Sequence, residues 1–360
     1  GPITLSTAGA ASIVLPDLVG DFTFAGVTAG GAITLGNATD TGTLTFDSDG
    51  GSVINGVGPA ASVASGTVTV LADAIVLNDP ITTEGGPVNL TADTGAITSA
   101  SGADITTTGA VNEGVASGKI TVVGQTDVTL QDLTSTGNNS DSDVGANAAA
   151  IQVTATTGDL SVGAVTATGG DASENATFPN RNGGNAGNIL LEAPEGTVFL
   201  TGDLTAVGGS PFGAADTGLG GFVQIGDSDP TNFDDPAVIT GDLSITTGTT
   251  TGDIAIYTDV DSDNGTNHTL TLTAGSGNVL VEGAIGGNVP LSRFEVESSV
   301  RTDIEDSITT SGAPPSGGDA GVIIQASSVT FLGDNDVASG SGAIVLNTEA
   351  NNGVITFSDP

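Results

Sequence analysis

Apolar and polar residues alternate in short stretches along this chain, and glycine, aspartate or asparagine separates the stretches. Residues 118–122 read Gly-Lys-Ile-Thr-Val and residues 187–191 read Gly-Asn-Ile-Leu-Leu. A period of two predicts strands of roughly three to five residues with one buried face. Glycine and aspartate recur too often for long helices. The pattern therefore predicts an all-β protein with almost no helix.

The strands form a repeating cassette of an apolar strand, a second strand and a glycine-rich loop. Its opening apolar residues are Ile120, Ile151, Ile189 and Val223, whose spacing is unequal, whereas Val68 and Val88 bound a bare unit of 20 residues. A unit of this length cannot bury its own apolar face. Neighbouring units must therefore stack on one another as a solenoid. A constant strand pattern with unequal spacing predicts insertions at one corner. The predicted insertions are residues 137–149, 169–187, 208–220 and 312–318.

Two architectures suit short alternating strands, a row of sandwich domains and a parallel β-helix. Sandwich domains usually carry longer strands and large aromatic core residues. Aromatic residues make up only 3% of this chain, and tryptophan is absent. We therefore expect one parallel β-helix across residues 1–360, with roughly 12 to 16 stacked coils.

The strongly negative net charge of the chain excludes several classes of binding partner. Lys and Arg total 4 and Asp and Glu total 42, for a net charge of −38. Nucleic acid and anionic lipid are excluded as partners because both need a cationic surface. No apolar stretch approaches the ~20 residues of a membrane span. Cysteine is absent, which excludes disulfides, thiolate metal sites and cysteine nucleophiles.

Acidic loops are the candidate metal sites, and calcium is the candidate ion. Alternating carboxylates in a tight loop can direct several oxygens toward one cation. An EF-hand is excluded because Leu270 stands where that motif needs glutamate. In the alternative interpretation, Asp and Asn form turns by bonding their own backbone. The candidate calcium ligands are Asp259, Asp261 and Asp263 in one loop, and Asp227, Asp229, Asp234 and Asp235 in another.

Enzymatic functions find little support. A polysaccharide lyase needs a base and cations that neutralise a uronate, but the four cations are dispersed over Lys119, Arg181, Arg293 and Arg301. His268 is the only histidine and is expected to be a solvated loop residue. We therefore predict no catalytic residues, and a polysaccharide-degrading enzyme ranks third among the functions.

Thr-x-Thr pairs such as Thr67 and Thr69 are similar to the ice-binding faces of some β-helical proteins. These pairs do not recur at one fixed spacing in the sequence. Threonine is also an ordinary outward-facing strand residue, and we expect that role here.

Two segments carry a family resemblance. Residues 183–193 and 316–326 resemble the repeats of filamentous-haemagglutinin-type exoproteins, and residues 270–279 resemble the β-strand repeats of very large bacterial surface proteins. The resemblance implies a right-handed β-helical shaft on the bacterial cell surface or outside the cell, used in adhesion or a biofilm matrix. Such repeats specify architecture more strongly than function.

Strand-like alternation extends through residues 3–5 and 354–357. We therefore expect end-to-end self-association or continuation into a longer chain. The leading hypothesis is a non-enzymatic adhesin shaft or filament subunit. The alternative is a calcium-dependent module that binds surface glycans through its corner loops.

Overall fold

The computed structural model describes residues 2–16, 18–36, 42–48, 53–56, 64–109, 115–139, 144–173, 180–227, 236–311, 320–332, 337–338, 343–348 and 354–358. Within these ranges the chain is all-β, as the alternating pattern predicts. All of its strand-to-strand ladders are parallel. Within the same ranges no helix could span a membrane.

The strands form three parallel columns, because each strand pairs with the strand about three positions later in the chain. One passage through the three columns is called a coil here. Column 1 contains β2 (Ile13–Leu15), β4 (Ile33–Leu35), β7 (Val68–Ala72), β10 (Val88–Ala92), β13 (Ile120–Gly124), β16 (Ile151–Ala155), β19 (Ile189–Glu192), β22 (Val223–Ile225), β25 (Ile254–Ile256), β28 (Asn278–Val281), the second halves of β29 (Arg293–Ile304) and β31 (Ala320–Leu332), and β34 (Val354–Ser358).

Column 2 follows column 1 in each coil. It contains the first part of β3 (Phe22–Ala29), β5 (Thr43–Phe46), β8 (Ala74–Leu77), β11 (Ile97–Ser99), β14 (Val128–Thr129), β17 (Leu160–Val162), β20 (Val198–Leu200), β23 (Ala237–Ile239), β26 (Val260–Ser262), β30 (Ile308–Thr309) and β32 (Val337–Ala338). Ile285 joins β26 to β30 through isolated parallel bridges.

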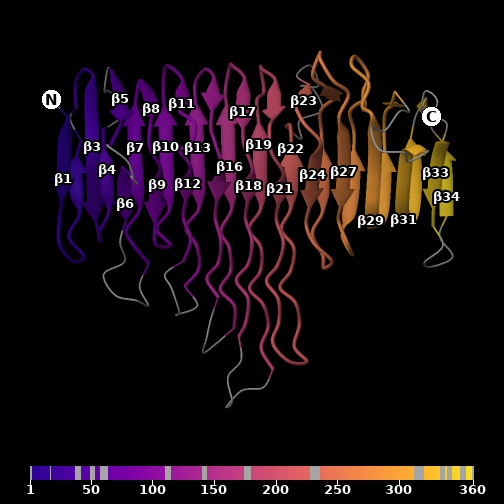
Figure 1. Cartoon of the computed structure of the whole chain (residues 1–360), viewed down its shortest axis with the longest axis horizontal. Helices are drawn as coiled ribbons and strands as arrows, with labels where there is room; N and C mark the ends of the chain where they lie inside the picture. Colours follow the sequence, from indigo (N-terminus) through magenta and orange to yellow (C-terminus); the bar gives the residue numbers. More distant parts are fainter. Residues whose placement is uncertain are drawn as a thin grey trace.

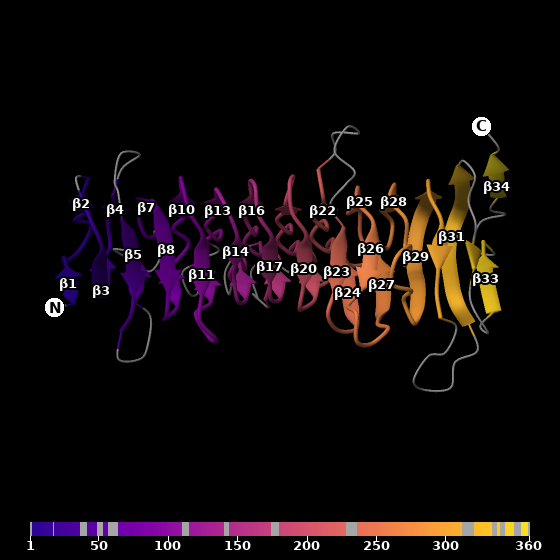
Figure 2. The ribbon, with the colours of Figure 1, turned by 90° about the horizontal axis from the view of Figure 1, so that it is seen from above.

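Column 3 completes each coil. It contains β1 (Ile3–Ser6), the second part of β3, β6 (Ile54–Gly56), β9 (Ile81–Thr83), β12 (Ile105–Thr106), β15 (Leu133–Thr134), β18 (Val165–Thr166), β21 (Leu204–Thr205), β24 (Leu243–Thr246), β27 (Thr269–Thr273), the first halves of β29 and β31, and β33 (Ala343–Asn347). The coils succeed one another along the longest axis, with the two termini at opposite ends (Figures 1 and 2).

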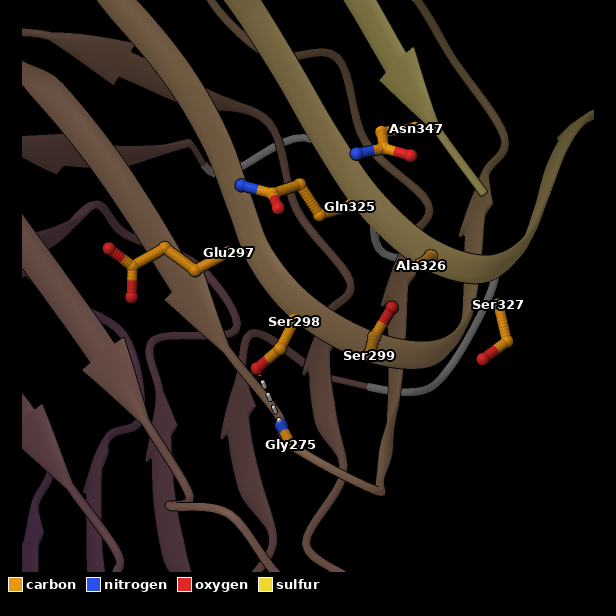
Figure 3. Close-up of a pocket in the computed structure, with 8 residues that line it drawn as sticks. All are labelled: Gly275, Glu297, Ser298, Ser299, Gln325, Ala326, Ser327 and Asn347. Atoms are coloured by element: carbon orange, nitrogen blue, oxygen red, sulfur yellow. Dashed lines mark hydrogen bonds between the residues drawn. The ribbon is translucent and has the colours of Figure 1, made fainter. Parts of the chain in front are cut away.

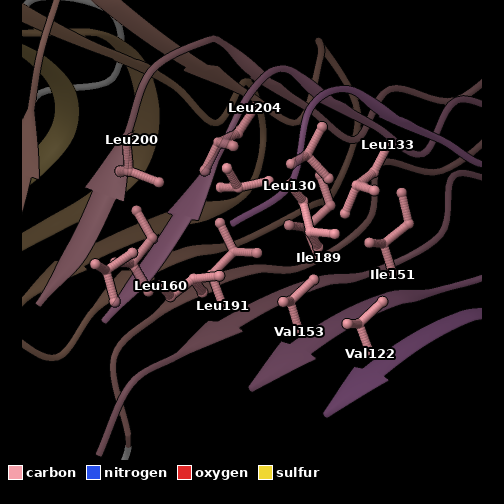
Figure 4. Packing of buried hydrophobic residues seen from close by; sticks show 14 of the residues in the cluster. Val122, Leu130, Leu133, Ile151, Val153, Leu160, Ile189, Leu191, Leu200 and Leu204 are labelled. Atoms are coloured by element: carbon pink, nitrogen blue, oxygen red, sulfur yellow. The ribbon is translucent and has the colours of Figure 1, made fainter. Parts of the chain in front are cut away.

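The hydrophobic core lies between the three columns. In β16 the residues alternate between buried and half-buried, and the same alternation recurs in most other strands. Val153 of column 1, Leu160 of column 2 and Leu204 of column 3 belong to one buried cluster and point into the same interior (Figure 4). Small and branched side chains fill this interior because each coil must stack directly on the next.

The predicted register of the cassette is confirmed. Ile120 pairs with Ile151, Ile151 with Ile189, and Ile189 with Val223. Val68 pairs with Val88, so the bare unit of 20 residues is one complete coil. Column 1 has thirteen strands or strand parts among the described residues, within the expected range of coils.

One predicted equivalence is wrong. The shared resemblance of residues 183–193 and 316–326 predicts that Val322 lies in column 1, with the apolar residues that open each cassette. Val322 instead pairs with Phe294 in column 3, and β31 then continues around the corner to Val329 in column 1. Alternation is the same in all three columns, so it identifies the buried face but not the column.

Three of the four predicted insertions lie between a column-3 strand and the next column-1 strand. The predicted insertion 312–318 instead follows β30 of column 2 and precedes the first half of β31 in column 3, so one common corner is wrong for it. We call the described parts of residues 107–118, 135–150, 167–188 and 206–222 the glycine fin, which extends to one side of the columns (Figure 1). The predicted insertion 208–220 is fully described, whereas 312–318 and parts of 137–149 and 169–187 lie outside the described residues. The outgoing arms continue the parallel pairing of column 3, for example from Gly137 N to Thr168 O at 2.9 Å.

Glycine joins the two layers of this fin. A zigzag of backbone hydrogen bonds crosses between outgoing and returning arms, from Gly170 N to Ala146 O, Gly184 N to Gly170 O, and Gly209 N to Gly184 O, each 2.8 Å long. A Cβ on Gly184 would lie 1.9 Å from the carbonyl oxygen of Ala146. The layers therefore approach as backbone against backbone, which only glycine permits.

Candidate functional site

Aspartate and asparagine side chains connect successive coils. In this recurring contact, the Oδ1 atom accepts a hydrogen bond from a backbone N–H of the following coil. The alternative interpretation, in which Asp and Asn bond their own backbone, does not describe these contacts. The pairs include Asp132 with Ala164 N, Asp159 with Thr197 N, Asp203 with Ser244 N, Asp242 with Thr269 N, Asn185 with Leu219 N and Asn188 with Phe222 N.

The first candidate calcium loop uses its carboxylates in this way. Asp259 Oδ1 accepts from Ala284 N at 2.6 Å, and Asp261 Oδ1 accepts from Asn288 N and Val289 N at 2.9 and 3.0 Å. Asp261 is only 4% exposed. Burial is the largest cause that raises the pKa of Asp259, while its bond from Ala284 lowers it and Asp306 and Asp261 raise it. These two side chains are thus directed toward the next coil.

Asp263 is the member of this loop that forms a local turn. Its Oδ1 accepts from Gly265 N and Thr266 N and lies 3.2 Å from His268 Nε2. The backbone bond from Thr266 is the largest cause that lowers the pKa of Asp263. The His268 side chain is only 13% exposed, so the expectation of a solvated histidine is wrong.

The second candidate loop is described only at Asp227, which raises the pKa of Glu192 in addition to the larger effect of burial. Asp229, Asp234 and Asp235 lie outside the described residues. Within the part of the chain that the structure covers, no three acidic or histidine side chains are arranged to hold a metal ion. Calcium binding stays a prediction.

A calcium titration of the thermal melt tests this prediction. An ion held by the folded loops and not by the unfolded chain raises Tm as its concentration passes the dissociation constant. We expect a rise at millimolar calcium that EDTA reverses and that equal magnesium does not reproduce. A Tm that is unchanged by calcium contradicts the hypothesis for both loops.

The four cationic residues occupy separate places. Lys119 donates to Gln152, and Arg181 is buried in the glycine fin. Arg293 and Arg301 both lie in β29 but in different columns, and each pairs with the acidic residue two positions later, Glu295 and Asp303. The cations are therefore as dispersed in space as they are in the sequence.

Threonines form one rank on the outer face of column 3. Although their sequence spacing is irregular, the insertions absorb the differences and each threonine aligns with the next. Threonine neighbours on adjacent strands stabilise a sheet by about 0.2–1 kcal/mol per pair. These threonines are half-buried on the outer face, which fits the ordinary strand role expected for them. The rank consists of Thr82, Thr106, Thr134, Thr166, Thr205, Thr246 and Thr273.

A cavity of about 510 Å³ lies where β29 and β31 turn from column 3 into column 1. Glu297, Gln325 and Asn347 project from successive coils along it (Figure 3). Ser298 Oγ accepts a bond from Gly275 N at 3.2 Å, and Glu297 accepts one from Thr273 at 2.9 Å. Hydroxyl, amide and carboxylate groups suit a polar ligand, and none of the described residues that line this cavity is aromatic.

A second depression, of about 280 Å³, lies on the outer face of column 1. We call it the column-1 groove, and its main residues are Phe222, Ala255, Tyr257, Leu280 and Arg301. Ala255 lies between Gln224 and Leu280 in the ladder. Its small side chain leaves the depression between larger neighbours.

Acidic side chains border one side of this groove. Burial, and then the charge of Glu282, raises the pKa of Tyr257 above its ordinary value of 10.0. Burial, and then Glu305, raises the pKa of Glu282. The groove edge is therefore partly dehydrated and negative.

Tyr257 is the only tyrosine in the chain, so its ionisation can be followed by ultraviolet absorbance. We expect a titration midpoint above pH 10.0 in the folded protein. Glu282→Gln should lower the midpoint because it removes a negative neighbour, while burial keeps it elevated. Glu195→Gln, at an exposed loop position, is the control and should leave the midpoint unchanged. A wild-type midpoint at or below 10.0 contradicts this environment.

Sequence reasoning missed both depressions, although two signals were present. After residue 222 the connections from column 3 to column 1 become short, at residues 247–253 and 274–277, and Phe222 and Tyr257 are rare aromatics at outward positions. Comparison of the chain with known family models, curated proteins and solved structures finds no match.

Proposed function

We propose that this chain is a non-enzymatic extracellular structural protein, a right-handed β-helical shaft of an adhesin or a subunit of a cell-surface filament. The observation that carries the proposal is the parallel register that continues from β2 to β34 through every coil of column 1. A solenoid of this kind grows along one axis and presents an extended, stiff body. Parallel crossovers strongly favour the right-handed form.

End-to-end association is supported by the last described coil. Ile355 and Phe357 align with the buried Val329 and Phe331, so they continue the inward-facing ladder. The Phe331 and Phe357 rings stack with centroids 5.1 Å apart, yet Phe357 is 70% exposed. Stacking of a further coil, from another copy of this chain or from a longer chain, would bury this apolar surface and pair the strand edges.

Negative-stain electron microscopy of the purified protein, in calcium and in EDTA, tests this proposal. Thirteen coils at ~4.8 Å each predict rods ~60 Å long that join into longer filaments. If light scattering shows only monomeric rods, self-assembly is contradicted, while the proposal of an adhesin shaft still stands. Rounded particles would contradict both, and left-handed coils in a high-resolution map would contradict the proposed hand.

A further inference from the structure

The column-1 groove combines two aromatic rings with an apolar floor. Phe222 and Tyr257 are half-buried on the outer face, and Ala255 and Leu280 lie between them in adjacent coils. Phe222 precedes β22 and Tyr257 follows β25, so the rings lie roughly 13 Å apart along the strand direction. The floor is therefore longer than one sugar ring.

Fixed polar groups lie at the Phe222 side of this floor. Arg301 Nε donates to Asp303 Oδ1 at 2.8 Å, and its NH2 group lies 2.6 Å from Asp303 Oδ2. Asn278 Nδ2 donates to Asp253 Oδ1 at 3.1 Å. A guanidinium has five N–H donors, so Arg301 retains donors beyond these two contacts. The Arg301 side chain is 57% exposed, which makes those donors accessible to a ligand.

The charges exclude an anionic ligand. Arg301 is neutralised by Asp303, whereas Asp253 in the groove and Glu282 and Glu305 at its edge form no ion pair with any described cation. The whole chain carries a net charge of −38, which repels uronates and sulfated glycans. A ligand with many hydroxyls and no charge matches this setting.

We propose that the column-1 groove binds a neutral oligosaccharide. The positive C–H edges of a sugar ring stack on the negative faces of Phe222 and Tyr257. Its hydroxyls accept from Arg301 and donate to Asp253 and Asn278. This binding goes beyond the structural role, needs no calcium, and lies on a column face rather than in the corner loops.

Tyrosine fluorescence tests the proposal directly, because Tyr257 is the only tyrosine and the chain has no tryptophan. The probes are short oligosaccharides from a β-glucan, a mannan and a galactan, with uronate oligosaccharides as the charged comparison. We expect at least one neutral probe to change the emission in a saturable way, equally in calcium and EDTA. Uronates should leave it unchanged. The proposal is overturned if no neutral probe changes the emission, or if uronates bind more tightly than the neutral probes.

Variants then locate the site. Phe222→Ala should weaken binding about tenfold, whereas Phe199→Ala, a half-buried outward ring on column 2, should change it by less than about twofold. Arg301→Gln should also weaken binding. Because the Arg301 side chain is exposed, this variant should fold normally and tests the site even if Phe222→Ala has a folding defect. Equal affinities for Phe222→Ala and Phe199→Ala overturn the proposal. Rod formation should be unaffected by any of these changes, so failure of the glycan site and failure of the shaft are separable.

Discussion

Replacing Gly184 with alanine is expected to destabilise the glycine fin by about 1–3 kcal/mol, because overpacking forces the backbone apart. The added Cβ would lie 1.9 Å from Ala146 O, and a carbonyl oxygen held by Gly170 N cannot move aside cheaply. The same contact recurs one row later, where a Cβ on Gly218 would lie 1.8 Å from Gly184 O. The zigzag should therefore open across several coils.

Hydrogen exchange of the backbone amides measures this effect. Protection should fall at Gly170, Gly184 and Gly209 while the strands β19 and β22 retain theirs, because none of these three glycines belongs to the core cluster, which of the fin residues includes only Ala167 and Ala206 at the start of the fin arms. Gly241→Ala is the matched control, since nothing lies within 4 Å of its added Cβ. Equal protection in the two variants would show that the fin layers are not packed through glycine.

Removing the Asp261 side chain is expected to lower the free energy of unfolding by about 2–4 kcal/mol, because each buried polar group left unsatisfied costs about 1–3 kcal/mol. Asp261 accepts from Asn288 N, Val289 N and Asn288 Nδ2, and it is 4% exposed. In Asp261→Ala these donors lose their partner in a place that water reaches poorly.

Chemical denaturation followed by circular dichroism measures the loss. Asp263→Ala serves as the control because its carboxylate is 40% exposed and bonds only its own turn and His268. Asp261→Asn keeps an acceptor at Oδ1 and should recover part of the stability. Unfolding midpoints that agree between Asp261→Ala and Asp263→Ala would contradict the inter-coil role of this carboxylate.

Much of the fold could be predicted from the alternation of apolar and polar residues and from the alignment of the repeats with one another. The pairs Ile120–Ile151 and Ile189–Val223 follow from the sequence because the same apolar residue opens each cassette and stacking requires like on like. The glycines of the insertions also stand out in the sequence. The reason why glycine is required there is not visible in the sequence, since only the structure shows that Gly184 faces a carbonyl oxygen of another coil.

The candidate sites were much less predictable. Asp259 and Asp261 were recognised as a pair because they alternate, yet their partners Ala284 and Asn288 lie a full coil later. The column-1 groove joins residues from four coils, among them Phe222, Tyr257 and Arg301. A local pattern carries no information about such distant neighbours.

The sequence by itself determined that short strands bury one face and stack as repeats, because period two and glycine punctuation are local properties. The tertiary structure alone decided which column each strand joins, as Val322 shows, and which outward residues become neighbours, as in the threonine rank. The physical reason is that insertions change the number of residues between equivalent strands of successive coils without changing the register of their hydrogen bonds. Contacts between coils therefore depend on three-dimensional stacking rather than on distance along the chain.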